Sequence, residues 1–423
     1  KAIRRQRQMC IRDRCEAMKA ELLAPAGNFS KLKTAFYFGA DAVYLGGKNF
    51  SLRAFSDNFD AEDLKKAVDY AHSLGKKAYV TANIFARNDD FAFLSDYFSY
   101  LAEIGADAAI VSDIGAMSVL KKAAPSLALH VSTQANTTNK YAVKFYAEEL
   151  GAERVILARE LSLKEIAEIR EFNPDTELEA FVHGAMCISY SGRCLLSDYL
   201  DGRSSNRGAC VQACRWKYEI RALNPTNGET GFLPLEEDGR GAYILNGKDL
   251  NMLSALDELE RTGVNSFKIE GRMKSEYYLA TVVNAYRRAM DGADTAFCEK
   301  ELCATAHRNF TKAYAYGNGG EKTEEYAAGQ VKGEYDYAAN VLSFENGVVR
   351  VEMRNRFKSG DKLNVLSPGQ YHGREITVGE MFSETDGETT TDAKRVQGIY
   401  SFPCEYPLHA GDLLRREVTE ARR

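Results

Sequence analysis

Short apolar runs alternate with amphipathic segments from Glu21 to about Met290, and this alternation is the strongest pattern in the chain. Each apolar run has the length of a buried strand, and each amphipathic segment has the period of a helix with one apolar face. The predicted strands are Glu21–Ala26, Ala42–Leu45, Ala78–Ala82, Ala108–Val111, Leu127–Val131, Val155–Leu157, Leu178–Val182 and Ser266–Ile269. The predicted helices are Ser30–Phe38, Ala61–Leu74, Ala92–Ile104, Gly115–Ala123, Lys140–Leu150, Leu163–Phe172 and Glu276–Met290.

Capping signals support these boundaries. Asp60 precedes the second helix and Gly75 follows it, while Ser162 and Glu165 have the spacing of a capping box. Eight strand–helix units over residues 18–292 predict an α/β fold of the (β/α)8 TIM-barrel type. A doubly wound open sheet is the alternative, but no Gly-x-Gly-x-x-Gly follows the first strand.

One unit of the repeat is interrupted, and the pattern changes after Gly292. Residues 184–265 form a cysteine-rich insertion after the seventh strand, at the barrel end that carries chemistry. Residues 293–325 read as a linker, residues 326–416 as a small all-β barrel or sandwich, and 417–423 as a tail. The alternating runs of this last domain are Gly329–Gly333, Val341–Phe344, Val348–Met353, Lys362–Val365, Ile376–Met381 and Gln397–Ile399.

The beginning of the chain differs from the rest. Residues 1–17 are basic and aperiodic, resemble translated sequencing-adapter sequence around Arg5–Arg14, and are expected to be a non-native or disordered leader before a start at Met18. The whole chain has a formal net charge of −5, so a nucleic-acid substrate would need a local basic patch. The longest charge-free stretch, 123–139, is polar in its second half, which predicts no membrane span and favours a cytoplasmic protein.

Polar residues follow most of the predicted strands and would converge on one barrel mouth. They are Asn83, Asp113, Gln134, Arg159, Glu160, His183, Glu270 and Arg272. A surface or structural role is the alternative for each of them. His183 could be a buried structural histidine, and Glu270 and Arg272 could form a simple ion pair around Gly271.

Nine cysteines without a secretory signal suggest a reducing compartment, in which clustered thiols are more often metal ligands or catalytic than disulfides. Four of them have the spacing Cys-x6-Cys-x15-Cys-x3-Cys: Cys187, Cys194, Cys210 and Cys214. This irregular spacing favours a [4Fe–4S] cluster over zinc, which remains the alternative. The surrounding loop is net positive and contains Tyr190, Tyr199, Tyr218 and the only tryptophan, Trp216, which would suit an unpaired base or simply a solvated face.

Several segments resemble peptidase family U32, the collagenase-like peptidase family. Its signature matches Glu179, Phe181, Gly184, Ala185, Met186, Cys187, Gly192, Cys194, Leu196 and Ser197. Further similar segments are ELLAPAG (21–27), VSTQANTTN (131–139), GACVQACRW (208–216) and KIEGRMKS (268–275). In its length and its all-β tail, the chain most resembles the proteins of the family branch that hydroxylates tRNA.

This resemblance implies an enzyme that converts the wobble uridine in the tRNA anticodon loop to 5-hydroxyuridine, with prephenate as co-substrate. The four clustered cysteines would hold the [4Fe–4S] cluster. His183 or Glu270 would transfer a proton, Arg159 and Arg272 would bind carboxylates, and Asn83, Asp113 and Gln134 would contact substrate. The family name implies a peptidase instead, with Cys187 as nucleophile and His183 as base. A non-catalytic RNA-binding or assembly protein is the third alternative.

Overall fold

The computed structural model describes residues 20–52, 58–187, 189–216, 221–223, 230–232, 247–317 and 331–418. The predicted leader therefore lies outside the described residues. The chain divides into two compact units. The first contains residues 1–32, 41–273 and 308–331, and the second contains residues 33–40, 274–307 and 332–423.

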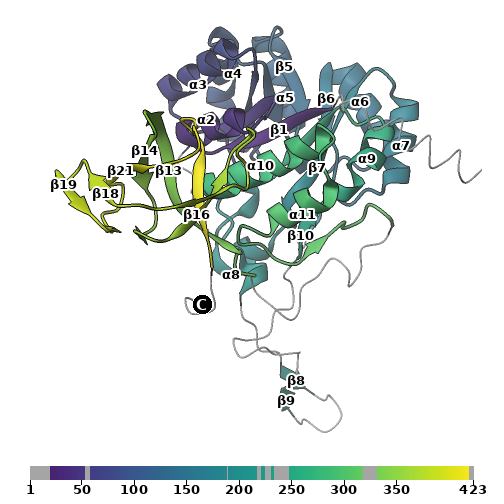
Figure 1. Ribbon diagram of the computed structural model, residues 1–423. Coiled ribbons are helices and arrows are strands. Elements are labelled where there is room, and N and C mark those ends of the chain that lie inside the picture. The colour runs from purple at the N-terminus through teal and green to yellow at the C-terminus, as the bar shows by residue number, and fades with distance from the viewer. Residues whose placement is uncertain are drawn as a thin grey trace, which may run out of the picture. The chain divides into compact units, whose positions relative to one another are not determined.

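The first unit is a closed barrel of eight parallel strands (Figure 1). In order they are β1 (Glu21–Ala26), β2 (Ala42–Gly46), β3 (Lys77–Ala82), β4 (Ala108–Val111), β5 (Ala128–Val131), β6 (Ala152–Ile156), β7 (Glu177–Ala185) and β11 (Ser266–Ile269). β11 pairs in parallel with both β7 and β1, which closes the ring. The predicted (β/α)8 barrel is confirmed, and the open sheet is excluded.

Helices follow the strands along the chain as the sequence pattern predicts. They are α2 (Phe29–Tyr37), α3 (Ala61–Ser73), α4 (Phe91–Glu103), α5 (Ile114–Ala123), α6 (Lys140–Leu150), α7 (Leu163–Phe172) and α10 (Glu276–Met290). The Asp60 side chain accepts a hydrogen bond from Asp63 N, and Ser162 with Glu165 forms a capping box. Both features satisfy backbone donors that a helix start leaves open. None of the helices in the described part of the chain is long and apolar enough to cross a membrane.

Strand β7 is longer than predicted, because β10 is a third partner in addition to β6 and β11. The sequence pattern ends this strand at Val182, but β10 (Asp249–Asn251) pairs with residues 183–185 in antiparallel register. Asn251 lies opposite His183, and β12 (Phe310–Thr311) pairs with β10 in turn. His183 is therefore inside a strand and not at its end.

The insertion after β7 contains short elements. In the described residues these are α8 (Leu196–Asp201), η4 (Ser205–Arg207), η5 (Ala213–Arg215), β8 (Arg221–Leu223), β9 (Thr230–Phe232), β10, η6 (Leu253–Ala255) and α9 (Leu256–Arg261). α9 precedes β11 and occupies the place of the helix between the last two barrel strands. Two shorter 3-10 turns, η2 (Asn88–Asp90) and η3 (Thr133–Ala135), follow β3 and β5.

The second unit includes α10, α11 (Thr295–Leu302) and an antiparallel all-β domain, as predicted for the C-terminal part. Its main sheet has the order β17-β16-β22-β13-β14-β21-β18-β19. The strands of this sheet are β13 (Tyr335–Glu345), β14 (Val348–Met353), β16 (Lys362–Leu366), β17 (Glu375–Thr377), β18 (Met381–Ser383), β19 (Glu388–Thr390), β21 (Ile399–Pro403) and β22 (Leu413–Glu417). β15 (Phe357–Lys358) and β20 (Asp392–Ala393) pair with each other in a separate two-stranded sheet. The predicted linker 293–325 contains α11 and β12. Of the predicted run 329–333, the first two residues lie outside the described part, and the rest form no extended strand.

Candidate functional site

A pocket lies at the carboxyl ends of the barrel strands, where TIM-barrel sites are built. Its lining residues are Tyr44, Leu52, Thr81, Asn83, Ile110, Ser132, Thr133, Gln134, Arg159, Phe181, Lys268, Glu270 and Arg272. The structure thus brings together five of the residues singled out in the sequence: Asn83, Gln134, Arg159, Glu270 and Arg272. They come from four different strand ends, so only the closed barrel makes them neighbours.

Arg272 is buried, with only 4% of its surface exposed, and hydrogen bonds fix its orientation. Its Nη1 donates to Thr81 Oγ1 at 2.9 Å, and its Nη2 donates to Ser51 Oγ at 2.7 Å. A β-carbon on Gly46 would clash with the same guanidinium, so this glycine leaves the space that Arg272 fills. The result is a fixed, buried positive charge at one side of the pocket.

Arg159 supplies a second cation. Its guanidinium lies 3.9 Å from the centre of the Phe181 ring, and its Nη1 donates to the carbonyl of Ala185 at 3.0 Å. Its buried Nε has no hydrogen-bond partner in the described structure. A buried donor without a partner is costly, which makes Arg159 a ready partner for an anionic ligand.

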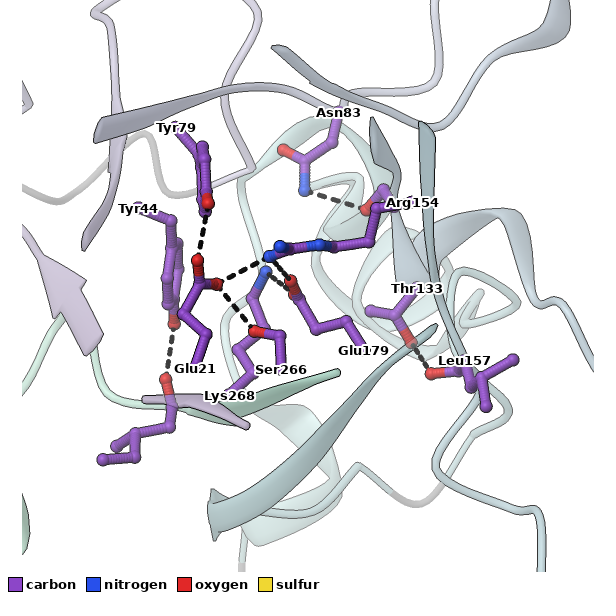
Figure 2. A network of polar contacts seen from close by, with 12 residues as sticks. Glu21, Tyr44, Tyr79, Asn83, Thr133, Arg154, Leu157, Glu179, Ser266 and Lys268 are labelled. Carbon is purple, nitrogen blue, oxygen red and sulfur yellow. Dashed lines mark hydrogen bonds and ion pairs between the residues drawn. The ribbon is translucent and has the colours of Figure 1, made fainter. Parts of the chain in front are cut away.

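Lys268, in the pocket lining, belongs to a buried network of charged side chains (Figure 2). Lys268 Nζ contacts Glu179 Oε1 at 2.6 Å and lies 4.4 Å from the centre of the Tyr44 ring. Arg154 contacts Glu179 at 3.1 Å and Glu21 at 2.6 Å. Burial lowers the pKa of Lys268, and the charge of Glu179 opposes that shift.

The sequence reading missed Lys268 and Glu179 as parts of the site. The available signal was a charged residue at an interior position of an otherwise apolar strand. Arg154, Glu179 and Lys268 show this signal, whereas Glu21 is the first residue of β1 and only partly buried. Charged residues are almost never fully buried unless they are paired, so three of them inside barrel strands predict a network.

Three of the residues predicted at the barrel mouth are absent from the pocket lining. Asp113 does not line the pocket but caps α5, accepting a hydrogen bond from Ala116 N at 2.9 Å. His183 is buried in β7, with its ring 5.7 Å from that of Phe310, and it does not line the pocket either. Glu160 accepts from Ser191 N at 3.2 Å, and burial raises the pKa of its carboxyl.

The cysteine-rich loop is anchored on the loops of the barrel mouth. Arg207 forms two hydrogen bonds with Asp90, at 2.7 and 3.1 Å, which hold the pKa of Asp90 below its usual value. Phe85 N donates to the carbonyl of Asn206 at 2.9 Å. Gly192 packs against the carbonyl of Gln134 so closely that a β-carbon there would clash. The described residues 189–216 of the loop are therefore fixed beside the pocket.

The four clustered cysteines are free thiols with surroundings suited to thiolates. Backbone N–H groups two residues further on point at three of the sulfurs: Ser189 at Cys187, Leu196 at Cys194, and Gln212 at Cys210. Such donors stabilise a negatively charged sulfur.

Two of these thiols also contact each other. The Cys187 thiol donates to Cys194, which raises the pKa of Cys187 and lowers that of Cys194 to about 4. Cys214 lies within electrostatic range of Cys194 and Cys210. Within the described residues, no group of three or more His, Cys, Asp or Glu side chains lies close enough together to hold a metal ion as the side chains stand. The donor set still fits an iron–sulfur cluster or zinc, because four thiols, three of them with backbone N–H donors, share one anchored loop.

Comparison with known proteins agrees with this layout. Residues 27–325 match the model of peptidase family U32, and residues 333–415 match the peptidase family U32 C-terminal domain. The tRNA hydroxylation protein P1 of Bacillus subtilis (strain 168) is 37% identical over 412 residues, covering 94% of this chain and 95% of that protein. The tRNA hydroxylation protein P of Escherichia coli (strain K12) is 37% identical over 394 residues, covering 83% and 86%.

A third relative has a different name. The collagenase of Porphyromonas gingivalis (strain ATCC BAA-308 / W83) is 30% identical over 374 residues, covering 82% of this chain and 86% of that protein. The two family models together account for the barrel with its cysteine-rich loop and for the all-β domain. The chain belongs to peptidase family U32.

Proposed function

We propose that this chain is an RNA-modifying enzyme that hydroxylates C5 of the wobble uridine in tRNA, with prephenate as a required metabolite. One observation carries the proposal: a cationic pocket at the barrel mouth lies beside an anchored loop with four free cysteines. Relatives named tRNA hydroxylation proteins match almost the whole chain, which supports tRNA as the substrate.

The pocket cations suit a small dicarboxylate. Prephenate carries two carboxylates, and Arg272 and Arg159 would each bind one of them. Arg272 is already oriented by Ser51 and Thr81, so little side-chain entropy would be lost on binding. Lys268, in the pocket lining, would add a further positive charge.

Hydroxylation at C5 exchanges a hydrogen for a hydroxyl group and removes two electrons from the ring, so besides an oxygen donor and an electron acceptor the reaction needs a group that accepts the proton lost from C5. Glu270 lines the pocket and is the carboxylate placed to do so, whereas His183 is buried in β7 outside the pocket lining. Cys187, Cys194, Cys210 and Cys214 would hold a [4Fe–4S] cluster. When bound, such a cluster supplies one-electron transfer next to the pocket. The same thiols would suit structural zinc, which iron analysis distinguishes.

Nucleoside mass spectrometry of tRNA tests this function. A strain in which the gene is deleted should lose 5-hydroxyuridine and its derivatives, and expression of the chain should restore them. Restoration should fail for Glu270→Gln. Unchanged 5-hydroxyuridine in the deletion strain would contradict the proposal.

Peptide hydrolysis is the second candidate, because one relative is named collagenase. Cys187 would be the nucleophile, with His183 four residues before it as base. Metal-free protein should then cleave denatured collagen, Cys187→Ala should abolish cleavage, and Cys214→Ala should leave it intact. Equal effects of both substitutions would speak against a cysteine peptidase.

A further inference from the structure

Three aromatic side chains of the cysteine-rich loop are exposed to solvent. Tyr190 is 56% exposed, Tyr199 is 86% exposed, and Trp216, the only tryptophan of the chain, is 41% exposed. Each exposes a large apolar face close to the others in sequence. Large exposed apolar patches with a polar rim often mark the sites at which a protein binds a partner.

These rings lie on a segment that is attached to the barrel mouth at two places. Tyr190 immediately precedes Ser191 and Gly192, which contact Glu160 and Gln134 at the barrel mouth. Arg207, between Tyr199 and Trp216 in the sequence, forms two hydrogen bonds with Asp90.

The helix that carries Tyr199 belongs to the same packed loop. α8 lies against η5. Ser197 Oγ bonds to Cys210 Sγ at 3.7 Å and accepts from Val211 N at 3.3 Å. The three exposed rings therefore lie on one packed loop that is anchored at the barrel mouth.

Positive charge accompanies the rings. Arg193 is exposed between Tyr190 and Tyr199, and Arg203 is exposed at the end of α8. Arg215 donates to Gln212 Oε1 at 2.7 Å and lies directly before Trp216. Residues 189–216 contain four arginines and two aspartates, whereas the chain as a whole carries a net charge of −5, so this loop attracts a polyanion more than an average part of the surface does.

We propose that the aromatic loop surface, defined as Tyr190, Arg193, Tyr199 and Trp216, binds unpaired bases of an RNA loop by stacking, and so delivers the target base to the pocket. The inference deepens the proposed function, on which it rests, by naming the surface that recognises the substrate. Aromatic rings stack on bases whose faces are free, and arginines contact the phosphates between them. A duplex hides its base faces, so it should bind this surface poorly.

The test uses the full-length holoprotein, purified anaerobically, and fluorescence anisotropy at one fixed salt concentration. The probe is an RNA hairpin with an unpaired uridine in its loop, compared with the same RNA annealed to its full complement. We expect the hairpin to bind at least about tenfold more tightly than the duplex. Tyr199→Ala and Trp216→Ala should each weaken hairpin binding by about 5- to 100-fold.

Two control variants separate stacking from general damage. Tyr199→Phe retains the ring and should bind within about twofold of the unmodified protein. Phe172→Ala removes a side chain that is 38% exposed at the last residue of α7, at the barrel end opposite the pocket, and should also bind normally. Iron content and the visible spectrum should be unchanged in Tyr199→Ala, since its side chain is almost fully exposed.

The outcomes distinguish this inference from the proposed function. If Tyr199→Ala and Trp216→Ala bind the hairpin normally while tRNA modification depends on the gene, the stacking surface is wrong and the enzyme assignment stands. If hairpin binding requires the rings but a deletion strain keeps its 5-hydroxyuridine, the surface stands and the enzyme assignment falls. Equal affinity for hairpin and duplex would overturn the stacking surface in either case.

Discussion

Gly192, in the loop after β7, lies directly against the backbone carbonyl of Gln134, which follows β5. Its φ of +74° is in the left-handed region, where glycine alone is free of strain. Gln134 lines the pocket, so this contact connects the cysteine-rich loop to the pocket through main-chain atoms. The position of the loop over the mouth depends on the absence of a side chain at residue 192.

Gly192→Ala should therefore displace the loop. The new β-carbon would overlap the Gln134 carbonyl, and backbone atoms cannot move away as a flexible side chain would. We expect activity to fall at least about tenfold and the loop to become sensitive to limited proteolysis, because a displacement of 1 Å already costs about two orders of magnitude in rate. tRNA modification in the complemented deletion strain and peptide mapping measure the two effects.

Gly202→Ala is the matched control. Gly202 also has a left-handed φ, +63°, but a β-carbon there would meet no atom within 4 Å. Both variants carry the same backbone strain of about 1 kcal/mol, and only the first has the clash. If the two variants lose activity equally, the contact with Gln134 is not what positions the loop.

The buried network that includes Lys268 should be important for barrel stability. Arg154 is the common partner of Glu21 and Glu179, and Arg154→Met leaves two buried carboxylates without their guanidinium. Loss of one partner from a buried network costs about 3–5 kcal/mol. Urea unfolding should show this decrease, whereas Lys65→Met, which removes an exposed pair with Asp69, should change stability by less than about 0.5 kcal/mol.

Local sequence patterns predicted the barrel well, because its strands and helices alternate with clear periods and end at recognisable caps. Asp60 and Ser162 illustrate this, since each caps the helix that its side chain predicted. The strand ends also brought Asn83, Gln134 and Arg272 to one pocket. These inferences need only the rule that all strand ends meet at one barrel face.

Features that depend on contacts between distant segments were not predictable. β7 continues through His183 because β10, far along the chain, pairs with it. Asp113 was predicted as a site residue from its place after a strand, but its carboxylate instead accepts a hydrogen bond at the start of α5. The attachment of Arg207 to Asp90 likewise joins segments that no local pattern relates.

A pH-dependent stability is expected for the second unit. Burial alone would raise the pKa of Glu301, but contacts with His372 and Arg415, at 3.3 and 2.9 Å, outweigh it and hold the pKa at about 2. The folded pKa lies below the ordinary value of 4.5, so the stabilisation is present above about pH 4.5 and is lost as the pH falls toward 2. Its size is about 3 kcal/mol.

Unfolding free energies measured between pH 7 and pH 2 test this expectation. Glu301→Gln should be less stable at neutral pH, since Arg415 is buried, and should show a flatter loss of stability below pH 4.5. Glu384→Gln, which removes an exposed pair with Arg350, should retain the slope of the unmodified protein. A slope unchanged in Glu301→Gln would assign the acid sensitivity to other groups.

Ligand binding in the pocket should depend on the guanidinium of Arg272. Arg272→Lys keeps the charge but cannot donate to Ser51 and Thr81 while also forming a two-point contact with a carboxylate. We expect prephenate affinity to fall by about ten- to a hundredfold, the equivalent of one charged hydrogen bond. Isothermal titration calorimetry measures this, and Arg203→Lys in the exposed part of the loop is the control. Unchanged affinity would place the dicarboxylate elsewhere.

The four clustered cysteines should act as one unit. If Cys187, Cys194, Cys210 and Cys214 each give one thiolate to a cluster, loss of any one leaves an iron without its full set of ligands. Alanine at each position should therefore lower iron content and visible absorbance to a similar extent. The barrel should stay folded, because its strand pairing does not involve the loop that carries these residues.

The remaining described cysteines provide the comparison for this last expectation. Cys298, Cys303 and Cys404 lie in the second unit, and their replacement by alanine should leave iron content unchanged. Cys210→Ala is the most informative of the loop variants, because Cys210 is exposed and little packing is lost with it. Its effect on iron therefore reports ligation and not general instability. Full iron content in Cys210→Ala would mean that another residue supplies the fourth ligand, and the assignment of the cluster to these four thiols would have to be abandoned.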